Sequence, residues 1–423
     1  MWPVAPASLP TAHWQTISGN VGHHRGPTIS YPCPLPPRAA TSVSTGHPTN
    51  PVAPPAAAPS QPPPHIRIGV IGVGNMGQHH ARVLSLLKDV DFIGVSDISP
   101  ERGLDLASKY RVRYFEDYHA LLPLVDAVCI AVPTRLHHTV GLACLNAGVH
   151  VLIEKPIAAN ITEAESLVNA AAAANRILQV GHIERFNPAF QELQNVLKTE
   201  EMLAIEAQRM SPYSDRANDV SVVLDLMIHD IDLLLDLVQS PVVKLAASGS
   251  SASHSEGQQG QLDYVTATLD FESGIVATIT ASKVTHSKIR RMAVHCKNSL
   301  VEADFLNHEM LIHRQTTANW TTNHGQVLYR QDGLIEKVYT SNIEPLHAEL
   351  EHFVSCVRGR IEPSVGGSQA LRALKLASAI EQQAMATHTP GQPTATQAIA
   401  PPPSEREIHL GSTQTTQPEC EIV

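Results

Sequence analysis

A glycine-rich turn between a predicted strand and a predicted helix constrains the fold of this chain more than any other segment. The apolar run Ile66–Ile71 leads into Gly72-x-Gly74-x-x-Gly77, after which a helical pattern begins. Gly72 lets the chain turn sharply, Gly74 lets the backbone approach a phosphate, and Gly77 lets the helix pack closely on the strand. The free N–H groups at the helix start bind anions. The segment therefore predicts a dinucleotide site, and the alternative is an ordinary glycine turn.

An acidic residue at the end of the next apolar run supports the dinucleotide site. Asp97 closes the run Phe92–Asp97 and follows Gly77 by 20 residues. A carboxylate at this place binds the hydroxyls of the adenosine ribose, and it would repel a ribose 2′-phosphate. We therefore expect the cofactor to be NAD rather than NADP. The residues expected to contact it are Gly72, Gly74, Asn75, Met76, Gly77, Asp97, Pro133, Glu154 and Lys155.

The first half of the chain alternates between short apolar segments and helical patterns. Predicted strands lie at 66–71, 92–97, 113–115, 127–132, 150–153 and 177–180, and predicted helices at 78–88, 99–110, 118–122, 137–147 and 162–174. Buried strands that alternate with helices require a parallel sheet covered on both faces. The pattern predicts an α/β fold that begins with a doubly wound Rossmann domain over residues 65–184.

The pattern changes after about residue 185. Alternating apolar and polar residues predict strands at 203–209, 264–271, 275–281, 292–296, 300–305 and 310–313, and helical patterns lie at 221–238 and 346–357. We expect these helices to cover one face of a mostly antiparallel sheet, whose other face stays open for substrate or for a partner subunit. Residues 185–386 are thus predicted to form an α+β domain for substrate binding and homo-oligomer contacts.

The two ends of the chain differ in composition from the rest. Residues 1–64 are rich in Pro and Ala and contain only Arg25 and Arg38 as charged residues, so we expect a disordered extension. Residues 387–423 are rich in Pro, Thr and Gln and are expected to form a flexible tail.

Composition and charge argue against several classes of protein. A formal charge of −10, without a basic stripe, disfavours a nucleic-acid partner, and no segment has the ~18 consecutive apolar residues of a membrane span. The six cysteines form no C-x-x-C pair and are typical of buried thiols in a reducing compartment, so we expect a cytoplasmic protein. The 23 histidines show no cluster at metal-ligand spacing, and we assign no metal.

The segment Glu154-Lys155-Pro156 directly follows the predicted strand 150–153. It therefore lies at the carboxyl edge of the sheet, where doubly wound folds bind their ligands. When an alcohol is oxidised by hydride transfer, negative charge develops on its oxygen, and a fixed ammonium stabilises that charge. Lys155 is our candidate for this role. The alternative is a solvated surface lysine that pairs with Glu154.

Asp225 and His229 lie four residues apart on the predicted helix 221–238, so their side chains share one face. A general base that works near neutral pH is most often a histidine, and a neighbouring carboxylate can orient the ring or raise its basicity. We therefore expect His229 to take the hydroxyl proton, with Asp225 as its partner. The alternative is a helix-start acid and a core histidine.

The order and spacing of these three motifs resemble the Gfo/Idh/MocA family of NAD(P)-dependent sugar and cyclitol oxidoreductases. The resemblance spans roughly residues 66–386 and rests on the glycine turn, on Glu154-Lys155-Pro156 and on Asp225-x-x-x-His229. It implies that Lys155 contacts the substrate hydroxyl, that His229 is the acid/base, and that Asp225 is a partner of the substrate or the base. It also implies a nicotinamide at the sheet edge, facing the second domain.

Within that family, the segments Gly181–Pro188 and Val223–Asp232 are most similar to the bacterial UDP-N-acetylglucosamine 3-dehydrogenases. This implies a dehydrogenase that oxidises a secondary ring hydroxyl of a nucleotide sugar by hydride transfer. The alternatives are a cyclitol or free-sugar dehydrogenase and a non-catalytic dinucleotide-binding regulator. Arg185 and Asn187 are candidate substrate donors, since arginine pairs well with phosphate and sugar oxygens. The other interpretation of these two residues is a helix-start cap and a surface salt bridge.

Overall fold

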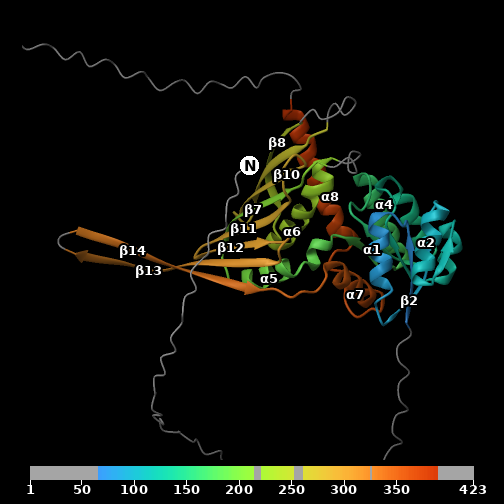
Figure 1. Cartoon of the computed structure of the whole chain (residues 1–423). Helices are drawn as coiled ribbons and strands as arrows, with labels where there is room; N and C mark the ends of the chain where they lie inside the picture. The colour runs from blue at the N-terminus through green and yellow to red at the C-terminus, as the bar shows by residue number, and fades with distance from the viewer. Residues whose placement is uncertain (1–64, 214–220, 252–260, 324–325, 389–423) are drawn as a thin grey trace, which may run out of the picture. The chain divides into compact units, whose positions relative to one another are not determined.

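The structure is a computed structural model that describes residues 65–213, 221–251, 261–323 and 326–388. The expected extension 1–64 and, apart from its first two residues, the expected tail 387–423 lie outside the described residues. The described strands form a six-stranded sheet followed by an eight-stranded sheet (Figure 1). The predicted succession of a Rossmann domain and a mostly antiparallel α+β domain is confirmed.

The first sheet is parallel and has the doubly wound order β3-β2-β1-β4-β5-β6. Its strands are β1 (Ile66–Ile71), β2 (Val90–Ser96), β3 (Arg113–Phe115), β4 (Ala127–Ile130), β5 (His150–Glu154) and β6 (Leu178–Gly181). The strand order reverses between β1 and β4, and sheets of this kind bind ligands outside the carboxyl ends of the strands at such a reversal. The glycine turn follows β1 at this edge, and Lys155 follows β5.

Four α-helices lie between these strands in the chain: α1 (Asn75–Leu84), α2 (Pro100–Tyr110), α3 (His137–Asn146) and α4 (Ile161–Ala174). The side chain of Asn160 caps α4 by accepting a hydrogen bond from the N–H of Glu163. The helix predicted at 118–122 consists instead of two short 3-10 turns, Tyr118–Ala120 and Leu122–Leu124. Pro123 lacks an N–H and disfavours a helical conformation of the preceding residue, which prevents a continuous α-helix.

The second sheet has the order β14-β13-β12-β11-β7-β10-β9-β8 and is antiparallel except for the pair β7 and β10. Its strands are β7 (Met202–Met210), β8 (Val242–Ser250), β9 (Tyr264–Phe271), β10 (Val276–Ser282), β11 (Ile289–Cys296), β12 (Ser299–Asp304), β13 (Glu309–Asn323) and β14 (Gln326–Tyr339). The sequence pattern does not predict β8 or β14. The second half of β8 consists of Ala, Ser and Gly, which carry little strand signal.

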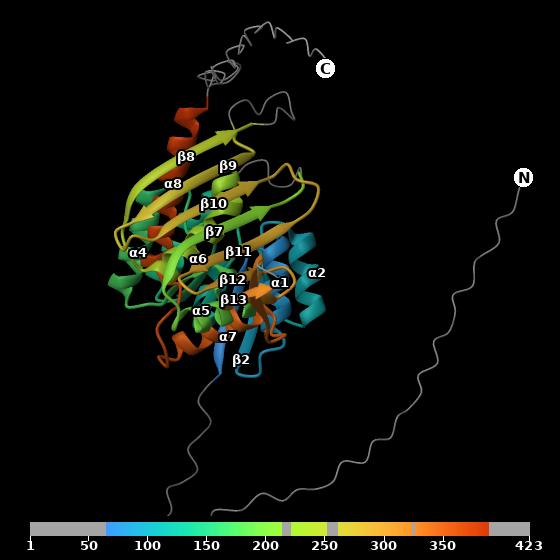
Figure 2. The same ribbon diagram turned by 90° about the vertical axis from the view of Figure 1, so that its left-hand side faces the viewer.

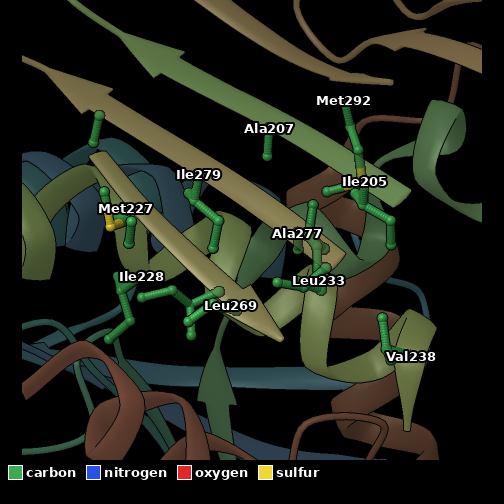
Figure 3. Close-up of a cluster of buried hydrophobic side chains, with 14 of the residues drawn as sticks. Ile205, Ala207, Met227, Ile228, Leu233, Val238, Leu269, Ala277, Ile279 and Met292 are labelled. Atoms are coloured by element: carbon green, nitrogen blue, oxygen red, sulfur yellow. The ribbon is translucent and has the colours of Figure 1, made fainter. Parts of the chain in front are cut away.

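One face of the second sheet packs on α5 (Pro188–Leu197), α6 (Ile228–Val238) and α8 (Gly367–Thr387). Ile205, Leu233 and Ile279 are among the side chains that fill the core between sheet and helices (Figure 3). The opposite face of the sheet is turned toward the viewer in Figure 2. The prediction of a sheet with one helix-covered face therefore agrees with the structure.

The helix α7 (Pro345–Val357) does not cover the second sheet as predicted. Its apolar side chains, including Leu350 and Phe353, lie in one buried cluster with residues of β1, β4 and β5. The chain thus returns to the first sheet after completing the second. The division predicted at residue 184 separates two sheets, but the core of the Rossmann domain also needs this later helix.

The predicted helix 221–238 begins with a π-helical turn, Val223–Met227, which α6 continues. The N–H of Ile228 donates to the carbonyl oxygen of Val223, five residues earlier. Single π-turns within helices are frequent at functional sites. This wider turn carries Asp225.

Two compositional predictions can be compared with the described residues. Cys129, Cys144, Cys296 and Cys356 are buried free thiols, as predicted. None of the described helices combines the length and the apolar character that crossing a membrane requires.

Candidate active site

The three glycines of the turn have the geometry that a dinucleotide site requires. Gly72 has a φ of +87°, and a Cβ there would lie 2.7 Å from the carbonyl oxygen of Ala131. A Cβ on Gly77 would lie 1.9 Å from the carbonyl oxygen of Gly72, so glycine is needed for α1 to approach β1. Gly74 caps α1, and a Cβ there would meet no atom within 4 Å. The turn therefore fits a bound pyrophosphate.

The other predicted cofactor residues lie along the same edge of the sheet. Asn75 and Met76 form the first turn of α1, the former exposed and the latter half-buried. Pro133 follows β4 and, with Thr134 and Pro156, helps to line a cavity of about 520 Å³. These positions are compatible with the predicted contacts to a dinucleotide.

Asp97 lies just after β2, with its carboxylate held against the glycine turn. One oxygen accepts from the N–H of Val73 (2.8 Å), and the other accepts from the N–H of Ser99 (2.8 Å) and from Arg102 (3.0 Å). Burial opposes the ionisation of Asp97, but these hydrogen bonds outweigh it and lower its pKa. Asp97 is thus a fixed carboxylate at the predicted ribose position. Arg102, which the sequence motifs do not point to, brings a cation to the same place.

Lys155 connects the edge of the first sheet with the π-helical turn. Its Nζ donates to the carbonyl oxygen of Asp225 (2.7 Å) and lies 3.4 Å from Oδ1 of the same residue. Burial lowers the pKa of Lys155, whereas the charges of Asp225 and Glu154 act in the opposite direction. Only 19% of the side chain is exposed, so Lys155 is not the solvated surface lysine of the alternative interpretation.

The carboxylate of Asp225 lies between two ammonium groups. Its Oδ1 faces Lys155, and its Oδ2 lies 3.4 Å from Nζ of Lys283, which directly follows β10. From the sequence, this carboxylate is expected to support His229. The described ion pairs of Asp225 instead make it a partner of the two lysines.

His229 is buried in a cationic environment. Burial lowers the pKa of the ring well below 6.5, and the charges of Lys155 and Arg209 act in the same direction. The net shift is therefore opposite in direction to the raised basicity that a neighbouring carboxylate alone would give. Nδ1 of His229 is buried and has no hydrogen-bond partner among the described residues. The imidazole is uncharged at neutral pH, which is the form that can accept a proton.

A buried ionic cluster holds the polar groups around His229. Arg209 is fully buried and donates to both oxygens of Asp230 (2.9 Å each) and to Glu184 (2.8 Å). Arg290 lies 3.3 Å from the same Glu184 oxygen. Because Asp230 directly follows His229, this cluster fixes the helix turn on which the imidazole stands.

Arg185 and Asn187 do not have the free donors that the sequence analysis assigned to them. Arg185 donates to Asp232 (2.5 and 2.9 Å) and pairs with Asp236. Asn187 caps α5 and donates to Glu184 (3.0 Å). The alternative interpretation, a cap and a salt bridge, describes both residues better, although the salt bridge is buried rather than on the surface. These contacts hold both side chains within the protein and not toward a substrate.

Sequence reasoning missed Lys283 and the buried histidines His80 and His137. His80 contacts Glu154, and His137 contacts the carbonyl oxygens of Val132 and Pro156. Each of the two histidines follows a predicted ligand-binding turn by a few residues, and this placement was the signal available in the sequence. Glu154 and Pro156 are distant in sequence from these histidines, so these two contacts could not be predicted from local spacing.

Comparison with known families identifies both parts of the chain. Residues 66–182 match the model of the Gfo/Idh/MocA oxidoreductase family with an NAD-binding Rossmann fold, and residues 199–302 match the model of its C-terminal domain. The chain belongs to this family. It is therefore an oxidoreductase, and the predictions of the family and of a dehydrogenase are confirmed.

Two curated relatives with different substrates resemble the chain over most of their length. The UDP-N-acetylglucosamine 3-dehydrogenase of Acidithiobacillus ferrooxidans is 34% identical over 69% of this chain and 89% of that protein. The myo-inositol 2-dehydrogenase of Thermotoga maritima is 28% identical over 75% and 96%, respectively. A crystal structure of the Acidithiobacillus enzyme superimposes with a TM-score of 0.68, at 32% identity, covering 76% of this chain and 99% of that one.

Proposed function

We propose that this oxidoreductase uses NAD to oxidise a secondary ring hydroxyl of a nucleotide sugar, at carbon 3 of UDP-N-acetylglucosamine or a close analogue. The observation that carries the proposal is the contact of Lys155 with Asp225, near His229 and at the sheet edge that bears the glycine turn. Similarity to the Acidithiobacillus enzyme over 89% of its length supports the nucleotide-sugar class.

We assign the two functions of an alcohol oxidation to Lys155 and His229. The ammonium of Lys155 stabilises negative charge on the substrate oxygen. The uncharged imidazole of His229 accepts the hydroxyl proton. Asp225 keeps the ammonium of Lys155 charged and oriented, and Lys283 balances the second oxygen of that carboxylate. A nicotinamide dinucleotide, held by the glycine turn and Asp97, would supply the acceptor for the hydride that leaves the substrate carbon.

The preference for NAD rests on Asp97, whose carboxylate is fixed beside the glycine turn. A carboxylate there favours a ribose with a free 2′-hydroxyl. Arg102 supports NADP as the second candidate, because an arginine at this place can bind a 2′-phosphate.

A cyclitol dehydrogenase is the second candidate function, favoured by the similarity to the Thermotoga inositol enzyme. The two are separated by incubating the protein with NAD or NADP and a panel of UDP-sugars, free sugars and inositols while recording absorbance at 340 nm. Reduction that requires UDP-N-acetylglucosamine supports the proposal, and reduction with an inositol alone supports the second candidate. Dinucleotide binding without turnover of any substrate would favour a non-catalytic regulator.

We also propose that the enzyme is a cytoplasmic homo-oligomer that associates through the open face of the second sheet. Ile335 and Tyr339 of β14 pair with His313 and Glu309 and are 61% and 89% exposed, which is unusual for large apolar side chains on a sheet. Analytical ultracentrifugation tests the assembly, because a monomer at micromolar concentration would contradict it. Changing Ile335 to Glu should weaken the assembly.

A further inference from the structure

Two buried histidines lie on either side of the turn that carries Lys155. His80, on α1, is fully buried, and its Nε2 donates to Oε1 of Glu154 at 2.7 Å. His137, at the start of α3, is 1% exposed, and its Nδ1 lies 2.8 Å from the carbonyl oxygen of Pro156. The residues before and after Lys155 are therefore each held by a histidine from a different helix.

The contact of His80 with Glu154 connects α1, which follows the glycine turn, with β5, which ends beside Lys155. His80 follows Gly77 by three residues on α1, one helical turn from the glycine motif. Glu154 is the last residue of β5, and its carboxylate lies beside Gly181, where a Cβ would approach Oε2 to 3.2 Å. The carboxylate is thus confined by α1 and by β6. A displacement of α1 would therefore act on the residue that precedes Lys155.

The core beside Glu154 contains several buried polar atoms without hydrogen-bond partners. Both oxygens of Glu349 on α7, Oε1 of Gln179 on β6 and Nδ1 of His80 are buried without a hydrogen-bond partner among the described residues. Gln179 donates only a long hydrogen bond to the backbone of Glu349 (3.4 Å). Burying polar groups in this way costs free energy, and apolar side chains of similar size often stabilise a core better. A functional role for the contact between His80 and Glu154 explains why polar side chains occupy this part of the core.

We propose that His80 and His137 are positioning residues that hold the Glu154-Lys155-Pro156 turn, so that the ammonium of Lys155 stays directed at Asp225. The inference rests on the proposed role of Lys155 in the reaction, and it adds the residues through which the cofactor helix controls that role. His80 acts through Glu154, and His137 acts through the carbonyl oxygen of Pro156. Neither histidine contacts the reacting atoms.

Two variants of His80 that carry the same amide on side chains of different length provide the test. The amide of His80→Gln lies at about the place of Nε2 and can still donate to Glu154, whereas that of His80→Asn is too short. We expect His80→Asn to lower kcat about 10- to 100-fold, since small displacements of catalytic groups are costly, with little change in the KM of the sugar. His80→Gln should restore most of kcat. His79→Asn, on the exposed side of α1, is the matched control and should behave as the wild type.

A double-variant cycle tests whether the effect acts through Lys155. In a Lys155→Met background, His80→Asn should have almost no further effect on kcat, because the residue that it positions is already absent. Equal kcat in His80→Asn and His80→Gln, or full additivity with Lys155→Met, would overturn the proposal. A fall in kcat that is matched by loss of NADH binding, measured by fluorescence, would also overturn it.

One measurement does not depend on turnover. Acetic anhydride modifies accessible amines, and mass spectrometry can compare the rate at Lys155 with that at Lys244, whose side chain is 76% exposed. Lys155 should react faster in His80→Asn and in His137→Leu than in the wild type, while Lys244 is unchanged. An unchanged rate at Lys155 would refute the positioning role even if no tested sugar is a substrate, which separates this failure from a failure of the proposed function.

Discussion

The ammonium of Lys155 lies 2.7 Å from the carbonyl oxygen of Asp225, a backbone atom of the π-helical turn Val223–Met227. The lysine at the end of β5 is therefore held by the main chain of the second domain as well as by a carboxylate. Because this contact joins the edge of the first sheet to the second domain, changes at either residue should alter the rate of the reaction directly.

Changing Lys155 to Met should lower kcat about 10²-fold or more, the order expected for loss of one group that stabilises a developing oxyanion. NADH affinity should stay within a few-fold of the wild type, because the glycine turn is untouched. Stopped-flow kinetics and fluorescence titration measure the two quantities. Lys244→Met is the control, and near-normal turnover of Lys155→Met would remove this lysine from the mechanism.

Changing Asp225 to Asn should shift the alkaline limb of the kcat profile to lower pH. Burial already lowers the pKa of Lys155, and the charge of Asp225 counteracts this effect. Without that charge the ammonium loses its proton at lower pH, and the stabilised oxyanion is lost with it. Rates of hydride transfer measured from pH 6 to pH 10 test this, and an unshifted alkaline limb would show that Asp225 does not support the charge of Lys155.

His229 should produce an acid limb that lies below pH 6.5. The sequence suggested a pKa near neutrality, but burial and the surrounding cations lower it well below 6.5. The ring therefore accepts protons throughout the neutral range, and kcat/KM should fall only at more acidic pH. His229→Asn should abolish this limb and lower the rate about 10²- to 10⁴-fold. A retained acid limb in this variant would assign it to another group.

Asp97 and Arg102 should have opposite effects on cofactor choice. Asp97→Ala is expected to reduce the preference for NAD over NADP, because the carboxylate that repels a 2′-phosphate is removed. Arg102→Ala should increase the preference for NAD over NADP, because a cation that can attract this phosphate is lost. The ratio of kcat/KM for NAD to that for NADP measures both effects. If neither variant changes the ratio, other residues select the cofactor.

Glu349 should make the protein less stable as the pH rises. Burial and the charge of Glu154 raise its pKa well above 4.5, so its protonated form favours the folded state. This contribution is complete below pH 4.5 and is lost as the pH rises through the raised pKa, at up to ~1.4 kcal/mol per pH unit. The difference in Tm between Glu349→Gln and the wild type should therefore be more favourable to the variant at pH 8 than at pH 5. Glu351→Gln, exposed on the same helix, is the control for thermal denaturation.

Local patterns were sufficient to predict the first sheet and the motifs at its edge. Glycine spacing, short apolar runs and Pro100 in the first turn of α2 act over a few residues, and the structure has these elements within a few residues of the predicted bounds. The placement of α7 could not be predicted in this way. Its apolar face fits either sheet, and only the path of the whole chain decides which sheet it covers.

The side-chain partners at the site were also beyond the reach of local patterns. Asp225 and His229 share a helix face, yet the charges around them come from residues far away in the chain. Lys155 and Lys283, 70 and 58 residues from Asp225, face its carboxylate, and Lys155 and Arg209 act on His229. Arg185 was assigned to substrate because arginine binds phosphate, but it neutralises Asp232 within the core. Buried ionic partners are set by tertiary packing, and one sequence does not reveal them.

The return of α7 to the first sheet has a consequence for synthesis of the chain. Leu346, Leu350 and Phe353 cover apolar residues of β1, β4 and β5, which the ribosome has made roughly 190 to 280 residues earlier. Until this helix emerges, the nascent Rossmann domain exposes part of its core. Emergence of α7 from the ribosome, rather than completion of the dinucleotide motif, therefore sets the moment at which the core of the cofactor domain can be completed, and products truncated before α7 should depend on chaperones or be degraded.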